Sequence, residues 1–298
     1  MRRVLVTGAS GFIGRGLLPV LVARGFEVHA VARSAQPAMS GVRWHAADLL
    51  TAAGRAHALS AARPTHLVHL AWEVRPGHYR EDPVNRLWAE ASIDLLALAR
   101  AGGAARILGI GSCLEYGPQS GPCDERTSLC RPTTLYGQAK LATAEAYIAA
   151  GAVWGRVFVP FGPNEPEARL IPSLIRSLHA GQSFDCSHGG QLRDFVYVDD
   201  LAQMTAAVLD GELTGAVNLA SGEARSLRSV IEHVAGLLDG RHLLRFGAVE
   251  AIGVDAEPIL AADVRSLRGV TAGVPLVGFE QGVARDLAWW IERLPRRM

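Results

Sequence analysis

Lysine is nearly absent from this chain of 298 residues, in which Lys140 is the only lysine among thirty lysines and arginines. The guanidinium of arginine stays charged in proteins, whereas the ammonium of lysine is compact and its pKa shifts readily with its surroundings. A chain that uses arginine at every other basic position therefore predicts that position 140 needs a property that arginine lacks. A chance residue in an arginine-biased composition is the alternative interpretation.

Cysteine pairs, long apolar runs and net charge are also scarce. The four cysteines show neither a CxxC pair nor a metal-ligand spacing, so we expect no metal, and reduced thiols indicate a cytoplasmic protein. No apolar run approaches the roughly 18 residues of a membrane span, so no membrane partner is expected. The formal net charge of +1 and the scattered arginines exclude an electrostatic attraction to nucleic acid.

A tyrosine precedes the single lysine by four residues, in the segment 135–140 (LYGQAK). Positions i and i+4 share one face of a helix, so the ammonium of Lys140 is expected beside the phenol of Tyr136. A nearby cation favours phenolate and lowers the pKa of a tyrosine from about 10. The pair therefore makes Tyr136 a candidate general acid or base.

The N-terminus predicts a dinucleotide site. An apolar run at 3–7 is typical of a buried parallel strand, and it is followed by the glycine-rich segment 8–14 (GASGFIG) and a helical pattern at 17–23. The glycines allow a tight turn and a close approach of the pyrophosphate, which faces the helix N-terminus. The spacing is GxxGxxG rather than GxGxxG, but its position between a first strand and a first helix indicates a bound dinucleotide.

Strand-like and helical patterns alternate through the first half of the chain. The strand-like runs lie near 3–8, 27–33, 65–71, 105–111 and 153–159, and the helical patterns near 13–24, 51–61, 84–101 and 134–149. This alternation predicts an α/β fold, a doubly wound parallel (Rossmann) sheet with helices on both faces.

The pattern changes from about residue 163, where prolines and glycines separate shorter elements. Amphipathic helices are expected at 169–179 and 227–238. We expect a dinucleotide-binding domain at 1–162, with 191–222 returning to it. The segments 163–190 and 223–298 are expected to form a smaller C-terminal substrate-binding lobe.

Together these motifs resemble the extended branch of the short-chain dehydrogenase/reductase family, which includes sugar-nucleotide epimerases, dehydratases and 4-ketoreductases. The resemblance covers nearly the whole chain, in six segments that follow in the family's order: 7–14, 66–71, 111–117, 136–140, 156–162 and 193–200. Six segments in order are specific for the fold, and much less so for the substrate.

The resemblance implies a catalytic set of three residues. Ser112 would hydrogen-bond the substrate oxygen and Tyr136 would protonate it, while Lys140 would lower the tyrosine pKa and bond the nicotinamide ribose. A buried structural serine is the alternative interpretation of Ser112. Cys113 and the residue after it stand where 4,6-dehydratases carry Asp-Glu, so dehydration is disfavoured.

The cofactor indicated is NADP, with NAD as the alternative. Arg33 ends the second predicted strand, where an acidic residue would suit NAD and an arginine can pair with a 2′-phosphate. Asp48 resembles the family position that bonds the adenine amine, and it could equally cap a helix. The cofactor-binding residues implied are Gly8, Ser10, Gly11, Phe12, Ile13, Gly14, Arg33, Asp48, Leu49, Leu70, Ala71, Tyr136 and Lys140.

The substrate site departs from the family pattern. Arg193 matches an arginine that holds the diphosphate of a sugar nucleotide, but Glu257 stands where many relatives carry a second phosphate-binding arginine. Either a nucleotide is held differently, with Arg169, or the substrate is not a nucleotide sugar. The candidate substrate-binding residues are Trp72, Cys113, Arg169 and Arg193.

The predicted function is an NADP-dependent reduction of a keto group, in the first place that of a nucleotide-linked 4-keto-6-deoxy sugar. The alternatives are a nucleotide-sugar epimerase that retains NAD, a reductase of a non-nucleotide ketone and, least favoured, a non-catalytic nucleotide-sensing protein. The segments 84–101 and 134–149 are the helices through which this family forms dimers, so a homodimer is expected.

Overall fold

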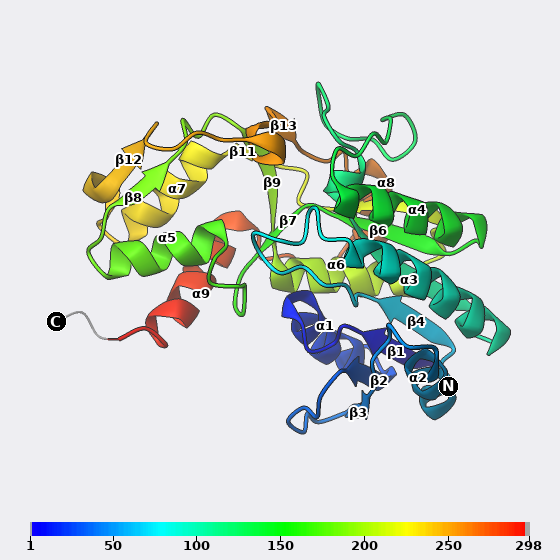
Figure 1. Ribbon diagram of the computed structural model, residues 1–298. Helices are drawn as coiled ribbons and strands as arrows, with labels where there is room; N and C mark the ends of the chain where they lie inside the picture. The colour runs from blue at the N-terminus through cyan, green and yellow to red at the C-terminus, as the bar shows by residue number, and fades with distance from the viewer. Residues whose placement is uncertain (1, 296–298) are drawn as a thin grey trace.

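A seven-stranded parallel sheet forms the larger part of the computed structural model, which describes residues 2–295 (Figure 1). Its strand order is β10-β6-β5-β4-β1-β2-β3, and every pair is parallel. The strands are β1 (Arg3–Thr7), β2 (Glu27–Ala32), β3 (Val42–Ala46), β4 (His66–His69), β5 (Arg106–Ser112), β6 (Val153–Val157) and β10 (Gly215–Leu219). The chain order reverses between β1 and β4, and ligands of open α/β sheets bind at the carboxyl side of such a switch point.

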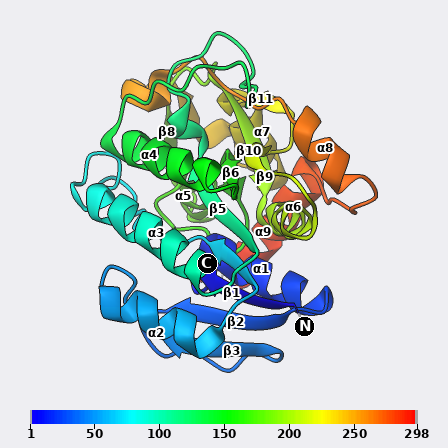
Figure 2. The same ribbon diagram turned by 90° about the vertical axis from the view of Figure 1, so that its right-hand side faces the viewer.

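Helices cover both faces of this sheet, which confirms the doubly wound Rossmann prediction (Figure 2). One face carries α2 (Ala52–Ala62), α3 (Val84–Ala101) and α4 (Leu135–Ala149), and the other carries α1 (Phe12–Ala23), α6 (Val198–Asp210) and α8 (Arg265–Thr271). The middle of β1 is wholly buried, as expected for a strand enclosed on both faces. Among the described helices, none combines the length and the hydropathy that a bilayer span requires.

A smaller lobe lies beside the carboxyl edge of the sheet (Figure 1). Its second sheet joins β7 (Val159–Phe161), β9 (Leu192–Tyr197), β11 (Ala224–Ser226) and β13 (Ile259–Leu260), and β8 (Phe184–Cys186) pairs with β12 (Leu244–Phe246). Around them lie α5 (Leu170–His179), α7 (Leu227–Leu237) and α9 (Phe279–Ile291), with the short helices η2 (Arg241–Leu243) and η3 (Gly253–Ala256). The short helix η1 (Cys113–Glu115) follows β5 and packs against α4 of the larger domain. Phe161, Leu174, Ile175 and Val230 are among the buried residues of this lobe's core.

The structure divides the segment 191–222, which was expected to return to the large sheet as a unit. Helix α6 and strand β10 do so, but β9 joins the second sheet instead. Strand β3 was not predicted, because it is an edge strand in which no residue is fully buried, so its sequence has no apolar run. The domain boundaries at 162, 190 and 222 stay a prediction.

Two glycines on β5 make room for large side chains that pack against this strand. A Cβ at Gly109 would lie 2.4 Å from the Trp154 ring, and one at Gly111 would lie 2.2 Å from both Glu115 Oε1 and Trp154 Nε1. These neighbours are buried and cannot move aside easily, so β5 can carry no side chain at either position without repacking.

We expect Gly109→Ala to lower the free energy of unfolding by about 1–3 kcal/mol, as overpacked cores do. Denaturant unfolding monitored by Trp fluorescence measures the change. Gly269→Ala is the matched control, because its Cβ would meet no atom within 4 Å and alanine favours a helix. An equal loss of stability in both variants would show that the space beside β5 is not the cause.

Candidate active site

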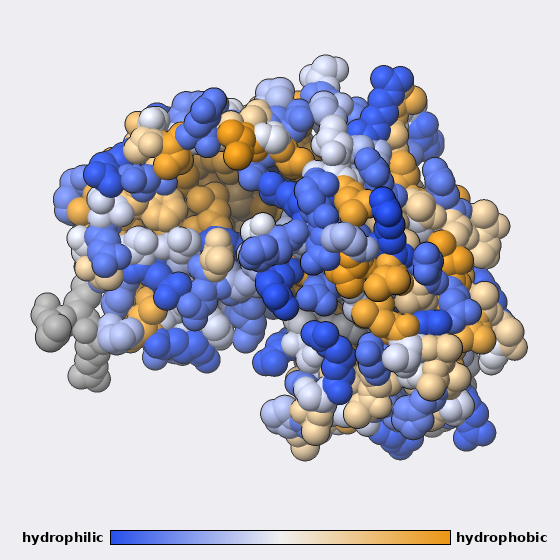
Figure 3. Space-filling model, in the orientation of Figure 1, coloured by the Kyte–Doolittle hydropathy of each residue, from blue (hydrophilic) through white to orange (hydrophobic). Residues whose placement is uncertain are grey.

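A cavity of about 850 Å³ opens at the carboxyl ends of the large sheet and extends to the smaller lobe. Figure 3 shows the molecule hollowed between the smaller lobe and the sheet domain. All candidate site residues named from the sequence line the cavity except Asp48. The structure therefore brings the glycine turn, the predicted catalytic set and the predicted substrate residues to one place.

The turn 8–14 has the shape of a pyrophosphate cradle. Gly8 has a φ of +64°, and a Cβ there would lie 2.7 Å from the backbone nitrogen of Ala71. A Cβ on Gly14 would lie 2.5 Å from the Gly8 carbonyl oxygen. Helix α1 begins at Phe12 without a side-chain cap, so its first N–H groups are left for an anion. These features fit a dinucleotide.

A buried chain of hydrogen bonds supports this turn from behind. The Thr7 hydroxyl accepts from the N–H groups of Leu70 and Ala71, each at 3.2 Å, and lies 2.7 Å from His69 Nδ1. Ser92 donates to a backbone carbonyl, so its oxygen accepts from His69 Nε2–H at 2.8 Å, and Nδ1 accepts from Thr7. Burial lowers the pKa of His69 to about 3, which keeps this ring neutral. Sequence reasoning missed this chain.

Of the two residues predicted to bind the adenosine part of the cofactor, Arg33 lines the cavity and Asp48 does not. Arg33 is exposed directly after β2, lines the cavity and makes no hydrogen bond or ion pair with another described residue. The Asp48 carboxylate is exposed and accepts the N–H of Leu50 at 3.0 Å. Thr51, not Asp48, caps α2, so the interpretation of Asp48 as a helix cap is wrong.

Ser112 ends β5, and Tyr136 lies in the first turn of α4 above it. The Ser112 hydroxyl accepts the N–H of Leu114 at 3.2 Å and lies near enough to Tyr136 to act on its pKa. The N–H of Tyr136 donates to the Arg80 carbonyl at 2.8 Å, and the rings of Tyr136 and Tyr79 meet edge to face at 4.9 Å. The tyrosine is therefore held from both sides.

Lys140 is buried beneath Trp72. Its ammonium donates to the Ile110 carbonyl at 2.7 Å and lies 3.9 Å from the centre of the Trp72 ring. Burial lowers the pKa of Lys140 to about 7, although the charge of Glu115 acts in the opposite direction. This lysine can therefore lose its proton near neutrality, which arginine cannot do.

The expectation that Lys140 lowers the pKa of Tyr136 is wrong for the protein alone. Burial raises the pKa of Tyr136, with Tyr79 adding to the increase and Ser112 opposing it. The ammonium lies 5.9 Å from the centre of the tyrosine ring and is directed to the Ile110 carbonyl. The helical spacing correctly predicts that Tyr136 and Lys140 share one face of α4. It does not predict how deeply Tyr136 is buried, and burial sets the direction of its pKa shift.

Glu115 forms the floor of the site rather than its lining. Its carboxylate is fully buried and accepts from the backbone N–H of Ser112 at 2.8 Å, Trp154 Nε1 at 2.9 Å and Arg156 Nε at 2.8 Å. The carboxylate thus fixes the residue that carries the predicted catalytic hydroxyl. The local capping pattern of Ser112 and Glu115 could have signalled this contact.

Trp72 is positioned by a buried asparagine. Trp72 Nε1 donates to Asn85 Oδ1 at 2.8 Å, and the Asn85 amide donates to the carbonyls of Tyr79 and Asp82 at 2.6 and 2.8 Å. Asn85 therefore joins Trp72 to the segment that covers Tyr136.

Cys113 also lines the cavity, but burial raises the pKa of its thiol to about 12, so it remains a neutral thiol.

The two arginines predicted to bind substrate are already engaged. Arg169 Nε donates to Glu165 at 2.7 Å. The Arg193 guanidinium donates to backbone carbonyls of Leu192 and Glu257, both at 2.8 Å, and of Val254 and Asp255, both at 3.2 Å. Either arginine would have to give up these bonds to hold a phosphate.

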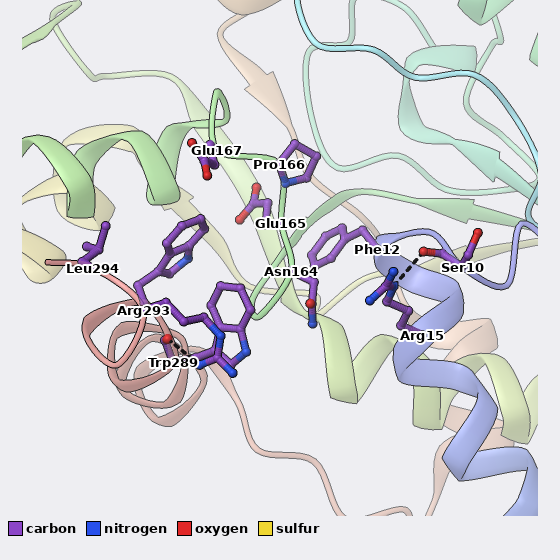
Figure 4. Close-up of a pocket in the computed structure, with 11 residues that line it drawn as sticks. Ser10, Phe12, Arg15, Asn164, Glu165, Pro166, Glu167, Trp289, Arg293 and Leu294 are labelled. Carbon is purple, nitrogen blue, oxygen red and sulfur yellow. Dashed lines mark hydrogen bonds between the residues drawn. The ribbon is translucent and has the colours of Figure 1, made fainter. Parts of the chain in front are cut away.

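A second cavity of about 460 Å³ adjoins the first, between the turn, the segment 164–167 and the end of α9 (Figure 4). Glu165 lines both cavities and is buried beside Asp286, a fully buried residue of α9. Burial raises the pKa of Asp286 to about 8, and the charge of Glu165 adds to this increase. Trp290 lies near the carboxyl of Asp286, but neither oxygen accepts a hydrogen bond of ordinary geometry from a described residue.

The doubly wound sheet, the glycine turn and the Ser-Tyr-Lys arrangement in one cavity define an NAD(P)-dependent enzyme of the extended short-chain dehydrogenase/reductase type. Comparison with known proteins agrees. The chain belongs to the NAD dependent epimerase/dehydratase family, whose family model matches residues 4–220.

The relatives of this chain are named for different reactions and substrates. A 3-diazoavenalumate denitrifying reductase from Streptomyces sp. is 32% identical over 250 residues, which cover 79% of this chain and 81% of the relative. A dTDP-6-deoxy-L-talose 4-dehydrogenase (NAD(P)(+)) from Kitasatospora kifunensis is 29% identical and covers 77% of each chain. The structure of MoeE5 in complex with UDP-glucuronic acid and NAD superposes with a TM-score of 0.84 at 27% identity, covering 98% of this chain and 100% of MoeE5.

The buried ammonium of Lys140 is expected to destabilise the fold. Its folded pKa of about 7 lies below the ordinary lysine value, so the unfolded chain binds more protons between pH 7 and 10 and stability rises with pH in this range. Lys140→Met should therefore raise the free energy of unfolding at pH 7 by about 1–4 kcal/mol, and by less at pH 9.5. Denaturant unfolding at both pH values is the measurement, and a variant less stable than wild type at pH 7 would contradict it.

The Asp286 carboxyl should produce the opposite pH dependence. Because its folded pKa is raised to about 8, the folded protein binds more protons than the unfolded chain between pH 4 and 8, and this contribution to stability is lost as pH rises through 8. Asp286→Asn should be more stable than wild type at pH 8.5 by about 1–3 kcal/mol, with a smaller difference at pH 5. The exposed Glu292→Gln on the following turn is the control. A difference that does not change with pH would exclude Asp286 as the titrating group.

Proposed function

We propose that this protein is an NADP-dependent oxidoreductase that reduces a carbonyl group, with Ser112, Tyr136 and Lys140 at the reacting end of the cavity. The observation that carries the proposal is the position of Tyr136 and Ser112 in the same cavity as the glycine turn. A hydroxyl donor and a second hydroxyl close together can bind one carbonyl oxygen.

The residues divide the work of the reaction. The turn 8–14 would hold the pyrophosphate of the cofactor, which would supply the hydride when bound. Ser112 donates a hydrogen bond to the carbonyl oxygen, and Tyr136 donates the proton. The raised pKa of Tyr136 keeps its hydroxyl protonated at neutral pH, so the hydroxyl can donate a hydrogen bond to the carbonyl oxygen. Lys140 is the polar group beneath Trp72 that can bond a ribose hydroxyl.

The substrate first expected, a nucleotide-linked 4-keto-6-deoxy sugar, has support from relatives named for dTDP-6-deoxy-L-talose. A ketone without a nucleotide is favoured by a different observation, the engagement of Arg193 by four backbone carbonyls. The relative named for 3-diazoavenalumate also has no nucleotide sugar in its name.

An epimerase is the second reaction to consider, because relatives include UDP-glucose 4-epimerases. Such a mechanism oxidises and then reduces one substrate, so it requires cofactor that stays bound between the two steps. Release of nucleotide from the purified protein by heat, followed by its absorbance, distinguishes the two. Bound NAD at one equivalent per chain would favour the epimerase.

We propose that α3 and α4 form a homodimer interface. Leu87, Ile93 and Leu98 of α3 and Ile148 of α4 are large apolar side chains exposed on these helices. Neighbouring exposed apolar residues are typical of an interface. Light scattering measures the assembly, and Leu87→Glu should shift a dimer toward monomer.

Replacing the proposed proton donor tests the reaction. Tyr136→Phe should lower kcat by about 10²–10⁴-fold, the range of general acid catalysis. The dissociation constant for NADPH, measured by fluorescence titration, should change by less than about 3-fold. Undiminished turnover would reject Tyr136 as the acid.

The choice of cofactor rests on Arg33. A charge-assisted contact to a 2′-phosphate forms with NADPH and not with NADH. Arg33→Ala should therefore weaken NADPH binding by about 10-fold and leave NADH binding unchanged. Arg43→Ala, an exposed arginine on β3, is the control. Equal affinity of the wild-type protein for both cofactors would contradict the assignment.

A further inference from the structure

Within residues 2–295, the substrate end of the cavity contains no cation that is free to bind a phosphate. Five cationic side chains line the cavity: Arg33, Arg80, Lys140, Arg169 and Arg193. Among the described residues, all but Arg33 have partners, and Arg33 follows β2 at the cofactor end. From this arrangement and from the aromatic side chains beside Tyr136, we infer that the substrate is an aromatic carbonyl compound without a phosphate group. The inference rests on the proposed carbonyl reduction.

Arg80 and Asp255 neutralise each other across the entrance. The two guanidinium nitrogens of Arg80 donate to the two carboxylate oxygens of Asp255 at 2.8 and 2.9 Å. This fork-to-fork geometry is the one that a phosphate would otherwise use. A nucleotide diphosphate would therefore have to compete with a carboxylate of the protein itself.

Arg193 lines the cavity, but its guanidinium is engaged by backbone carbonyls of the neighbouring segment. Three of its four acceptors are carbonyls of Val254, Asp255 and Glu257, which are consecutive or nearly so. The carboxylates of Asp255 and Glu257 also act on the pKa of Arg193, so both lie near its charge. This part of the cavity therefore disfavours a polyanion.

The start of α5 is another place where an anion could bind, and two features weaken it. Pro172 in the first turn has no N–H, and the Ser173 N–H already donates to the Arg169 carbonyl. Arg169 is paired with Glu165, whose other carboxylate oxygen accepts no hydrogen bond from a described residue. An anion there would meet the N–H groups of Leu170 and Ile171, but no arginine that is free of a partner among the described residues.

Aromatic side chains, rather than charged ones, surround the ring of Tyr136, the proposed proton donor. Trp72 and Tyr79 are partly exposed to the cavity and meet the Tyr136 ring edge to face at 6.2 and 4.9 Å. Trp88 stacks near Trp72 at 6.2 Å, and its buried indole N–H has no partner among the described residues. The partly exposed rings of Trp72 and Tyr79 offer apolar surface to a planar substrate.

Turnover and binding together test the inference. With NADPH, 4-hydroxyacetophenone and cinnamaldehyde should be reduced with kcat/KM at least 10-fold above that for dTDP-4-keto-6-deoxyglucose. In protein saturated with NADP⁺, which excludes binding at the cofactor end, dTDP and UDP should show no heat of binding at 1 mM. A selective reduction of the nucleotide-linked ketone, or dTDP binding below 100 μM, would overturn the inference and leave the proposed function intact.

Tryptophan fluorescence keeps the inference testable if none of these carbonyls is reduced. Failure of every carbonyl to oxidise NADPH would reject the proposed function. The substrate class would then be judged by binding: 4-hydroxyacetophenone should quench Trp72 fluorescence in the NADP⁺ complex, and the quenching should fall in Trp72→Phe. Binding of dTDP without binding of the aryl ketone would overturn the inference.

Releasing one arginine should create the missing phosphate site. Asp255→Asn leaves Arg80 without its carboxylate and should bring measurable dTDP binding, with at least 10-fold higher affinity than wild type in the NADP⁺ complex. Asp185→Asn is the matched control, because it releases Arg245 on the surface of the same lobe, outside the cavity. Equal dTDP binding by wild type and Asp255→Asn would show that the Arg80–Asp255 pair does not exclude phosphate.

Discussion

The buried carboxylate of Glu115 is the contact on which the reacting end of the cavity depends. It joins the last residue of β5 to the side chains of Trp154 and Arg156 on β6. A buried charge of this kind is costly unless its acceptors are filled, and here they are filled by three donors. The same acceptors explain why β5 carries glycine at position 111, where any side chain would meet Glu115. The position of the Ser112 hydroxyl is thus set by packing below it.

Electrostatics divides the cavity into two unlike ends. At the cofactor end, the uncapped start of α1 and the unpaired Arg33 leave positive potential for phosphates. At the substrate end, arginines are matched with carboxylates or carbonyls, and aromatic rings cover the remaining surface. Under the proposed function, the cofactor would be recognised largely by charge, and the substrate by shape and ring contacts. The family pattern alone does not reveal this difference, because Arg193 matches the pattern whether its guanidinium is free or already bonded to backbone carbonyls.

The sequence predicted the large sheet and the contents of the cavity well, for physical reasons that are local. Buried strands such as β1 are continuous apolar runs, and the glycine turn must have its residues in order. Strand β3 and the partners of Arg193 could not be predicted, because an edge strand lacks a pattern and the Arg193 contacts join residues more than 60 positions apart. The predicted direction of the Tyr136 pKa shift was wrong for the same reason. Burial under the segment 72–80 raises this pKa, and helical spacing does not describe that burial.

Arg80 belongs to both halves of the molecule at once. Its backbone carbonyl accepts the N–H of Tyr136, and its side chain holds Asp255 of the smaller lobe. A displacement of the η3 segment away from the sheet must therefore break a bidentate ion pair or pull on the residue that restrains the first turn of α4. Arg80 thus connects Asp255 of the smaller lobe to the backbone of Tyr136. The positions of the η3 segment and of the Tyr136 backbone are therefore coupled through Arg80.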